Sequence, residues 1–184
     1  MKFASADDFE AWMAAEHASS DGIWIEFAKK GSGVPSVTYA EAIEIALTYG
    51  WIDGQVKKSS EEGFYLQRFT PRRARSRWSQ INRDRALALI QAGRMKPAGL
   101  AEVERARADG RWDAAYAPPS RIEVPDDLRE ALDANPAARD FFATLSGSNR
   151  YGVLYRIHDA KRPETRARRI AQFVEMLARG ETLH

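Results

Sequence analysis

Arginines and aromatic residues gather in one stretch, residues 64–85, FYLQRFTPRRARSRWSQINRDR. The stretch has a charge of +6 (seven Arg less one Asp), whereas the whole chain has a formal net charge of only +2. The rest of the chain must therefore carry −4, and the basic character is local. One guanidinium group can donate two parallel hydrogen bonds to the oxygens of a phosphate or carboxylate, so this stretch predicts an anionic partner.

The centre of this stretch, residues 70–78, is named the arginine junction below. Its arginines fall between a predicted strand and a predicted helix, where the free N–H groups of a helix N-terminus also favour an anion. Three interleaved aromatic residues, Tyr65, Phe69 and Trp78, could stack on a base or ring as in single-stranded nucleic-acid binders. They could equally fill a hydrophobic core. The sequence leaves both interpretations open.

A second basic cluster lies at residues 150–169 and sums to +5 (seven Arg or Lys less two acids); its arginines include Arg150, Arg162, Arg166, Arg168 and Arg169. If folding brings it near residues 64–85, the two clusters would suit nucleic acid. The alternative is that these arginines pair with carboxylates in ordinary surface salt bridges.

Other reaction chemistry has weak support. Asp53, expected at the tip of an Asp-Gly hairpin beside Trp51, could act as a base, but aspartate in such a turn also serves backbone conformation alone. The three histidines show no metal-binding spacing, and the chain has no cysteine. Gly31-Ser32-Gly33 lacks the lysine of a phosphate-binding loop. We expect no metal and no cofactor, and a binding protein rather than an enzyme.

The first 117 residues read as a small antiparallel sheet flanked by helices. Asp7 or Asp8 can cap a first helix, and residues 23–29 alternate as a strand does. Thr38 and Glu41 form a capping box for the next helix. We expect two short strands around Asp53-Gly54, a strand at 64–69, and then two helices. The first of these is capped by Ser76 or Ser79 and carries Ile81, Leu87, Leu89 and Ile90; the second opens at Pro97.

Residues 118–121 resemble a linker, and the pattern beyond it is helical. Helix starts are predicted at Pro125, Asn135, Ser148 and Pro163, the last helix with a buried stripe of Ile170, Phe173, Val174 and Leu177. The expected fold is therefore α+β, with an α+β domain at 1–117 and a helical domain at 122–184. No apolar run reaches signal-peptide or membrane-span length, so a cytoplasmic protein without membrane insertion is expected. The oligomeric state stays open.

Several blocks of sequence resemble a known bacterial family. Residues 124–132 (VPDDLREAL), 135–138 (NPAA) and above all 161–170 (KRPETRARRI) are similar to the C-terminal domain of the YdeI/OmpD-associated family, also called the bacteriocin-protection family. Upstream, residues 46–55 (ALTYGWIDGQ), 69–73 (FTPRR) and 110–116 (GRWDAAY) are similar to the full-length pattern. The resemblance implies an α+β bacterial protein associated with stress or antimicrobial resistance, with no catalytic residues to transfer.

The sequence therefore predicts a non-enzymatic bacterial protein that binds an anionic small ligand or an acidic protein segment in a cleft between sheet and helices. The candidate ligand-binding residues are Trp51, Asp53, Gln55, Tyr65, Arg72, Arg73, Arg75, Arg77, Trp78 and Asn82. Two alternatives remain, nucleic-acid binding through both arginine clusters and an enzyme centred on Asp53 with a neighbouring arginine.

Overall fold

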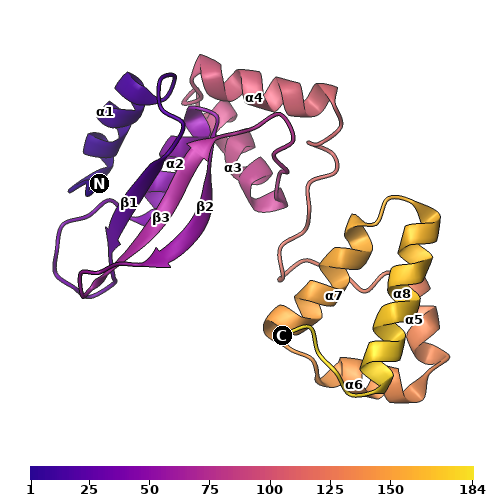
Figure 1. The fold of residues 1–184 in the computed structure, drawn as a ribbon. Coiled ribbons are helices and arrows are strands. Elements are labelled where there is room, and N and C mark those ends of the chain that lie inside the picture. Colours follow the sequence, from indigo (N-terminus) through magenta and orange to yellow (C-terminus); the bar gives the residue numbers. More distant parts are fainter. The chain divides into compact units, whose positions relative to one another are not determined.

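A computed structural model describes residues 1–184, and the chain divides into two compact units, Met1–Ala115 and Tyr116–His184. The first unit holds the sheet and four helices, and the second is entirely helical (Figure 1). This is the α+β fold that the sequence predicted. Each unit has its own hydrophobic core.

The sheet of the first unit has three antiparallel strands in the order β1-β3-β2. They are β1 (Ile23–Ala28), β2 (Trp51–Lys58) and β3 (Phe64–Pro71). The central strand β3 pairs with β1 in a register that sets Ile25 opposite Gln67 and Phe27 opposite Tyr65. The residues of β1 alternate between buried and half-buried, as its two-residue period predicted.

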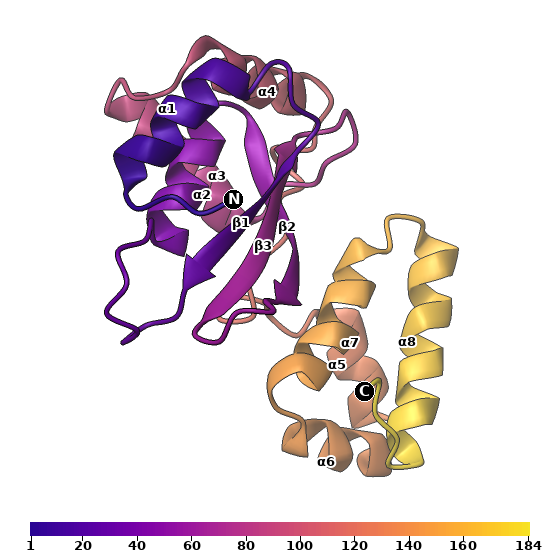
Figure 2. The same ribbon diagram turned by 60° about the vertical axis from the view of Figure 1, so that its left-hand side comes forward.

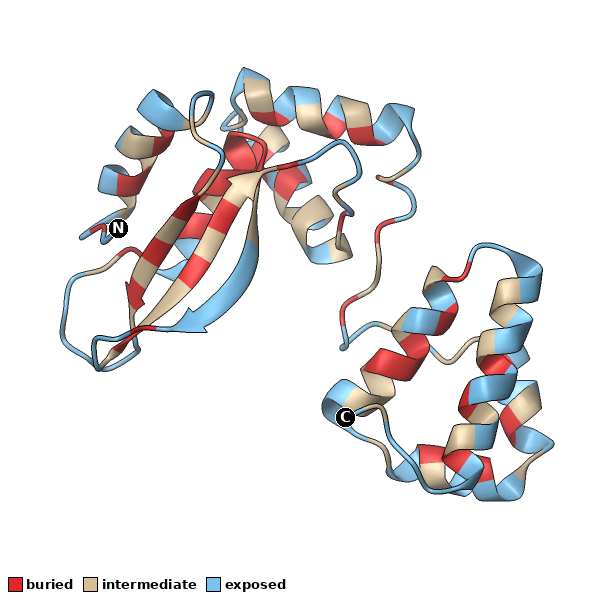
Figure 3. Ribbon diagram, viewed as in Figure 1, coloured by how far each residue is buried: buried red, intermediate tan, exposed pale blue.

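One face of this sheet is covered by helices. Helices α1 (Ala6–Glu16), α2 (Tyr39–Thr48), α3 (Gln80–Gln91) and α4 (Pro97–Ala108) share a single core with the buried residues of the strands. Figure 2 shows α1, α2 and α3 to one side of the sheet. On the other face Trp24 is only half-buried, and the ammonium group of Lys57 lies 4.4 Å from its ring centroid. Buried and half-buried residues alternate along β1, whereas the end of β2 is exposed (Figure 3).

The predicted hairpin turn at Asp53-Gly54 is wrong. Both residues lie inside β2, which runs unbroken to Lys58 and connects to β3 through residues 59–63. The left-handed backbone of this connection belongs to Gly63 (φ +83°), and Gly54 does not have a positive φ. Pairing with β3 instead contains a β-bulge between Asp53 and Val56. The long ladder with β3 satisfies more backbone groups than two short strands would, so it overrides the local Asp-Gly preference.

The helix ends of the first unit follow the capping signals with one correction. The capping box of Thr38 and Glu41 is present, and Ser79 caps α3. However, Ser5 rather than Asp7 or Asp8 caps α1, because its hydroxyl accepts a hydrogen bond from the amide of Asp8. The predicted apolar face of α3 is also only partly correct, since Ala86 and Leu89 are buried while Ile81 and Leu87 are 38% and 36% exposed.

The second unit packs four helices around a separate core. They are α5 (Asp126–Asp133), α6 (Pro136–Thr144), α7 (Gly147–Asp159) and α8 (Pro163–Ala178). Helix α8 opens at Pro163 as predicted, and Ile170, Phe173 and Leu177 are buried while Val174 is half-buried. Ser148 does not cap α7, because the helix begins after Ser146. None of the helices in either unit combines the length and apolarity needed to cross a membrane.

Candidate functional site

The arginine junction places its first arginine inside the protein. Arg72 is 5% exposed, and its guanidinium lies 3.6 Å from the ring centroid of Trp78. Its Nη1 donates to the carbonyl of Arg77 at 3.2 Å, and its backbone amide donates to the carbonyl of Gly50 at 3.0 Å. These contacts fold residues 72–78 around a cation–π pair.

Residues on and just after α4 complete the packing of the junction. Arg105 donates to the carbonyl of Arg72 at 3.3 Å, and Arg111 donates to the carbonyl of Ser76 at 2.8 Å. The ring of Trp112 meets Trp78 edge to face with centroids 4.9 Å apart. Trp78 is only 2% exposed, so its ring serves the core and offers no face to a base.

The other predicted ligand residues make separate contacts. Trp51 is 1% exposed, and its indole N–H donates to the carbonyl of His17 at 3.2 Å. Gln55 is exposed on β2, and the side-chain oxygen of Asn82 accepts from Arg85 at 3.3 Å. Three junction arginines remain exposed, Arg73, Arg75 and Arg77.

The second basic cluster is partly used for internal contacts. Arg166 forms a bidentate pair with Asp127 (Nε to Oδ2 2.5 Å, Nη2 to Oδ1 2.8 Å), and this pair lowers the pKa of the Asp127 carboxyl. Arg169 donates to the carbonyl of Arg156, and the guanidinium of Arg150 lies 4.4 Å from the ring centroid of Phe142. Two predicted members, Arg162 and Arg168, are exposed.

A hollow of about 680 Å³ lies where β1 ends and α2 begins. Tyr65 of β3 lines it, and this is the one predicted ligand residue that does so. The remaining lining comes from the end of β1, the following loop and the start of α2: Phe27, Ala28, Lys29, Lys30, Gly31, Ser32, Gly33, Val34, Ser36, Val37, Thr38 and Tyr39.

The loop that borders the hollow is shaped by two glycines and held at its far end. Gly31 and Gly33 have positive φ values of +86° and +73°, which other residues adopt at a cost. The Ser36 hydroxyl accepts from the amide of Ala28 at 3.3 Å, and the amide of Val37 donates to the carbonyl of Phe3 at 3.0 Å. The loop is therefore an ordered bend that returns directly into the capping box of α2.

Tyr39, the first residue of α2, connects the hollow to Asp53. Its hydroxyl donates to Asp53 Oδ2 at 2.9 Å, and the amide nitrogen of Gln67 lies 3.5 Å from the same oxygen. Burial raises the pKa of Tyr39 well above its usual value; the Asp53 carboxylate raises this pKa further, and Arg85 acts in the opposite direction. Tyr39 is therefore a neutral phenol that holds the Asp53 carboxylate.

The hollow combines an apolar floor with positive charge at its rim. The rings of Phe27 and Tyr65 stack with centroids 5.4 Å apart, and burial raises the pKa of the Tyr65 phenol. Lys29 and Lys30 are exposed at the rim, and neither forms an ion pair within the chain. This arrangement suits a small ligand that has both an apolar part and an anionic group.

Sequence reasoning missed Lys29, Lys30, Tyr39 and Gln67. The Lys-Lys-Gly-Ser-Gly run stands out in the sequence, but it does not match the phosphate-binding loop motif. Tyr39 directly follows the capping residue Thr38, which fixes it at the first turn of α2. The bulge between Asp53 and Val56 has no local sequence signal.

The fold and the hollow together define a two-unit α+β protein with a concave site on the sheet-bearing unit. Residues 1–102 match the family model described as a domain of unknown function, DUF8412, and the chain belongs to this family. Residues 121–180 match the model "Bacteriocin-protection, YdeI or OmpD-Associated", which confirms the resemblance seen in the sequence. Neither the curated proteins nor the solved structures contain a match to the chain.

Proposed function

We propose that the first unit is a binding module for a small anionic ligand, which sits in the hollow between β1, the 29–38 loop and α2. The observation that carries the proposal is the pairing of the half-buried Tyr65 ring, which stacks on the buried Phe27, with two lysines that no carboxylate neutralises. A volume of about 680 Å³ fits a small molecule better than an extended acidic protein segment.

The chemistry of the hollow supports binding rather than turnover. The Asp53 carboxylate, the nearest candidate base, already accepts the Tyr39 hydroxyl at 2.9 Å. The lysine ammonium groups offer charge-assisted hydrogen bonds to a carboxylate or phosphate, and the Tyr65 ring offers an apolar surface to the rest of the ligand. We infer a ligand made of a ring or short chain that ends in an anionic group.

A titration of the full chain with phenyl phosphate, followed by amide NMR, tests this proposal. We expect shifts centred on residues 27–39 and Tyr65, and weaker shifts with phenol, which lacks the anionic group. The Lys29→Ala/Lys30→Ala double variant should weaken binding about tenfold, because two charge-assisted contacts are lost. Lys57→Ala/Lys161→Ala removes the same charge elsewhere and should bind as the parent does. Equal weakening in both variants, or shifts centred elsewhere, would contradict the proposal.

Nucleic-acid binding is the second candidate. It is supported by Arg73 and Arg75, which are exposed on the junction and form no ion pair within the chain. Binding of a single-stranded oligonucleotide should then fall steeply with added salt and weaken in an Arg73→Ala/Arg75→Ala variant. Failure to bind at low salt would exclude this candidate without affecting the hollow.

The family matched by residues 121–180 carries bacteriocin protection in its name. We extend this to a proposed role of the whole chain in bacterial protection under antimicrobial stress. The test compares three bacterial strains during bacteriocin exposure: one that lacks the chain, one that carries the parent and one that carries the Lys29→Ala/Lys30→Ala variant. Their survival shows whether the hollow contributes to that role.

A further inference from the structure

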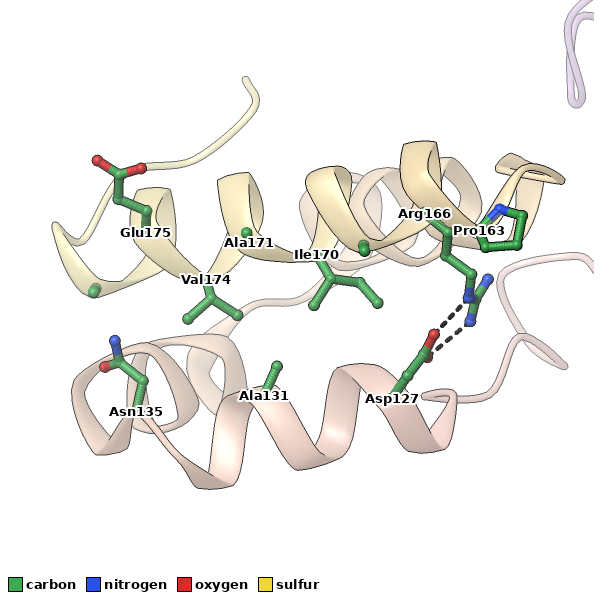
Figure 4. A pocket seen from close by; sticks show the side chains of 11 residues that line it. Asp127, Ala131, Asn135, Pro163, Arg166, Ile170, Ala171, Val174 and Glu175 are labelled. Atoms are coloured by element: carbon green, nitrogen blue, oxygen red, sulfur yellow. Dashed lines mark hydrogen bonds and ion pairs between the residues drawn. The ribbon is translucent and has the colours of Figure 1, made fainter.

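An apolar groove of about 690 Å³ runs between α5 and α8 in the second unit. Figure 4 shows Ala131 of α5 facing Ile170 and Val174 of α8, with the Asp127–Arg166 pair at one end and Asn135 near the other. The lining of the groove is mostly apolar, yet Ala167, Ala171 and Ala178 on its α8 side are exposed.

The spacing of these groove residues suits a second helix. Ala167, Ala171, Val174 and Ala178 recur at steps of four, three and four, which places them along one seam of α8. Their short side chains let the backbone of another helix approach closely. No helix of the second unit covers this seam, so it is open to a helix from outside the unit.

Charges along one flank of the seam identify that occupant. Four charges of alternating sign lie along α8 and its C-cap: Glu164, Arg168, Glu175 and Arg179. The midpoint between Glu164 and Arg179 falls just after Ala171, and so does the midpoint between Arg168 and Glu175. In an antiparallel helix pair the same flanks face each other, so a second copy of α8 sets Glu164 opposite Arg179 and Arg168 opposite Glu175. A parallel copy would set this flank against the opposite flank of the other helix, so these four charges would not pair with one another.

Two of these four charges form no ion pair within the chain and are available to a second copy. Glu164 and Arg168 form no ion pair within the chain, whereas Arg179 pairs with Glu175 at 2.9 Å and Glu181 at 3.0 Å. We propose that the protein forms a two-fold symmetric homodimer in which antiparallel α8 helices cover each other's apolar groove, with the axis passing beside Ala171.

Cysteine cross-linking tests the proposed register, because the chain has no cysteine of its own. Ala171→Cys should form an intermolecular disulfide under mild oxidation, since the two copies of residue 171 face each other near the axis. Ala178→Cys is the matched control: 13 residues of helical rise separate its two copies, about 20 Å, so it should not cross-link. Equal cross-linking of both variants, or none of Ala171→Cys, would overturn the proposal.

Sedimentation equilibrium on the full chain gives an independent measurement. Arg168→Glu should weaken dimerisation about tenfold, because it places a glutamate opposite Glu175 of the other copy and the two-fold axis produces this repulsion twice. Adding Glu175→Arg to this variant should restore the parent value. Arg162→Glu makes the same charge change just before α8 and should have no effect. A parent chain that stays monomeric at millimolar concentration, or an Arg162→Glu variant as weak as Arg168→Glu, would reject the α8 dimer.

Discussion

The α-carbon of Gly99 in α4 lies against the carbonyl of Thr48 at the end of α2, so closely that a Cβ on Gly99 would stand 2.3 Å from that oxygen. The same carbonyl accepts a hydrogen bond from the amide of Lys96 at 3.1 Å. The two helices therefore meet through backbone, and only glycine permits this approach.

Substitution of Gly99 by alanine should destabilise the first unit by about 1–3 kcal/mol, because α2 and α4 must separate to admit the methyl group. Urea unfolding followed by tryptophan emission measures this directly, since all five tryptophans lie in the first unit. Gly152→Ala in α7 serves as a control, measured by circular dichroism. Its Cβ would meet only side-chain atoms at 3.0 Å, so we expect a change below about 1 kcal/mol. Equal losses in both variants would refute the backbone contact.

Loss of the Trp78 side chain should cost the first unit about 3–5 kcal/mol, because it removes the ring that packs between Arg72 and Trp112 and leaves a cavity. Trp24→Ala, on the half-buried sheet face, should cost markedly less. Guanidinium unfolding of the two variants provides the comparison. A Trp78→Ala variant as stable as Trp24→Ala would show that the junction is not part of the core.

Replacement of Asp53 by asparagine should lower the pKa of Tyr39, since the variant removes the negative charge that disfavours the phenolate. Burial remains, so the pKa should stay above the ordinary tyrosine value. Carbon-13 NMR of labelled tyrosine through an alkaline titration measures the change, and Tyr39→Phe identifies the resonance. An unchanged Tyr39 titration would contradict the contact between these residues.

The pair formed by Asp127 and Arg166 should make the second unit less stable in acid. The folded pKa of Asp127 lies below its unfolded value, because Arg166 hydrogen-bonds to the carboxylate. The stabilisation is therefore complete above the unfolded pKa of about 3.9 and is lost as the pH falls through the folded pKa.

Asp127→Asn should lower stability by about 0.5–1 kcal/mol at pH 7, a modest figure because both side chains are partly exposed. The difference from the parent should vanish near pH 2. Thermal unfolding of the helical signal at both pH values measures it, with Asp133→Asn as a control for general loss of negative charge. A penalty that persists at pH 2 would indicate a role other than the ion pair.

The sequence was sufficient to predict those features of the fold that depend only on residues close together in the chain. The capping box of Thr38, the proline start of α8 and the alternation of β1 are all set within a few residues, and the structure confirms each. The α+β class followed from these elements together. The hairpin at Asp53-Gly54 was wrong because the pairing of β2 with a distant strand decides the local backbone.

The candidate site could be predicted only in part for a similar reason. Tyr65 was expected from its place on a strand, but the charge count alone could not show that Arg72 is buried against Trp78. That burial depends on Trp112 and Arg105, which lie about thirty residues further along the chain. The rim lysines belong to a loop whose path is set by the fold and not by a recognised motif.

The two separate cores also have a consequence for how the chain acquires its structure. The second unit consists of short helices with connections of a few residues, so most of its contacts are local and it should fold rapidly. The first unit must pair β1 with β3 across some forty intervening residues before its sheet exists, and this closure is slower. Because the first unit leaves the ribosome earlier, synthesis itself gives the slower unit a head start.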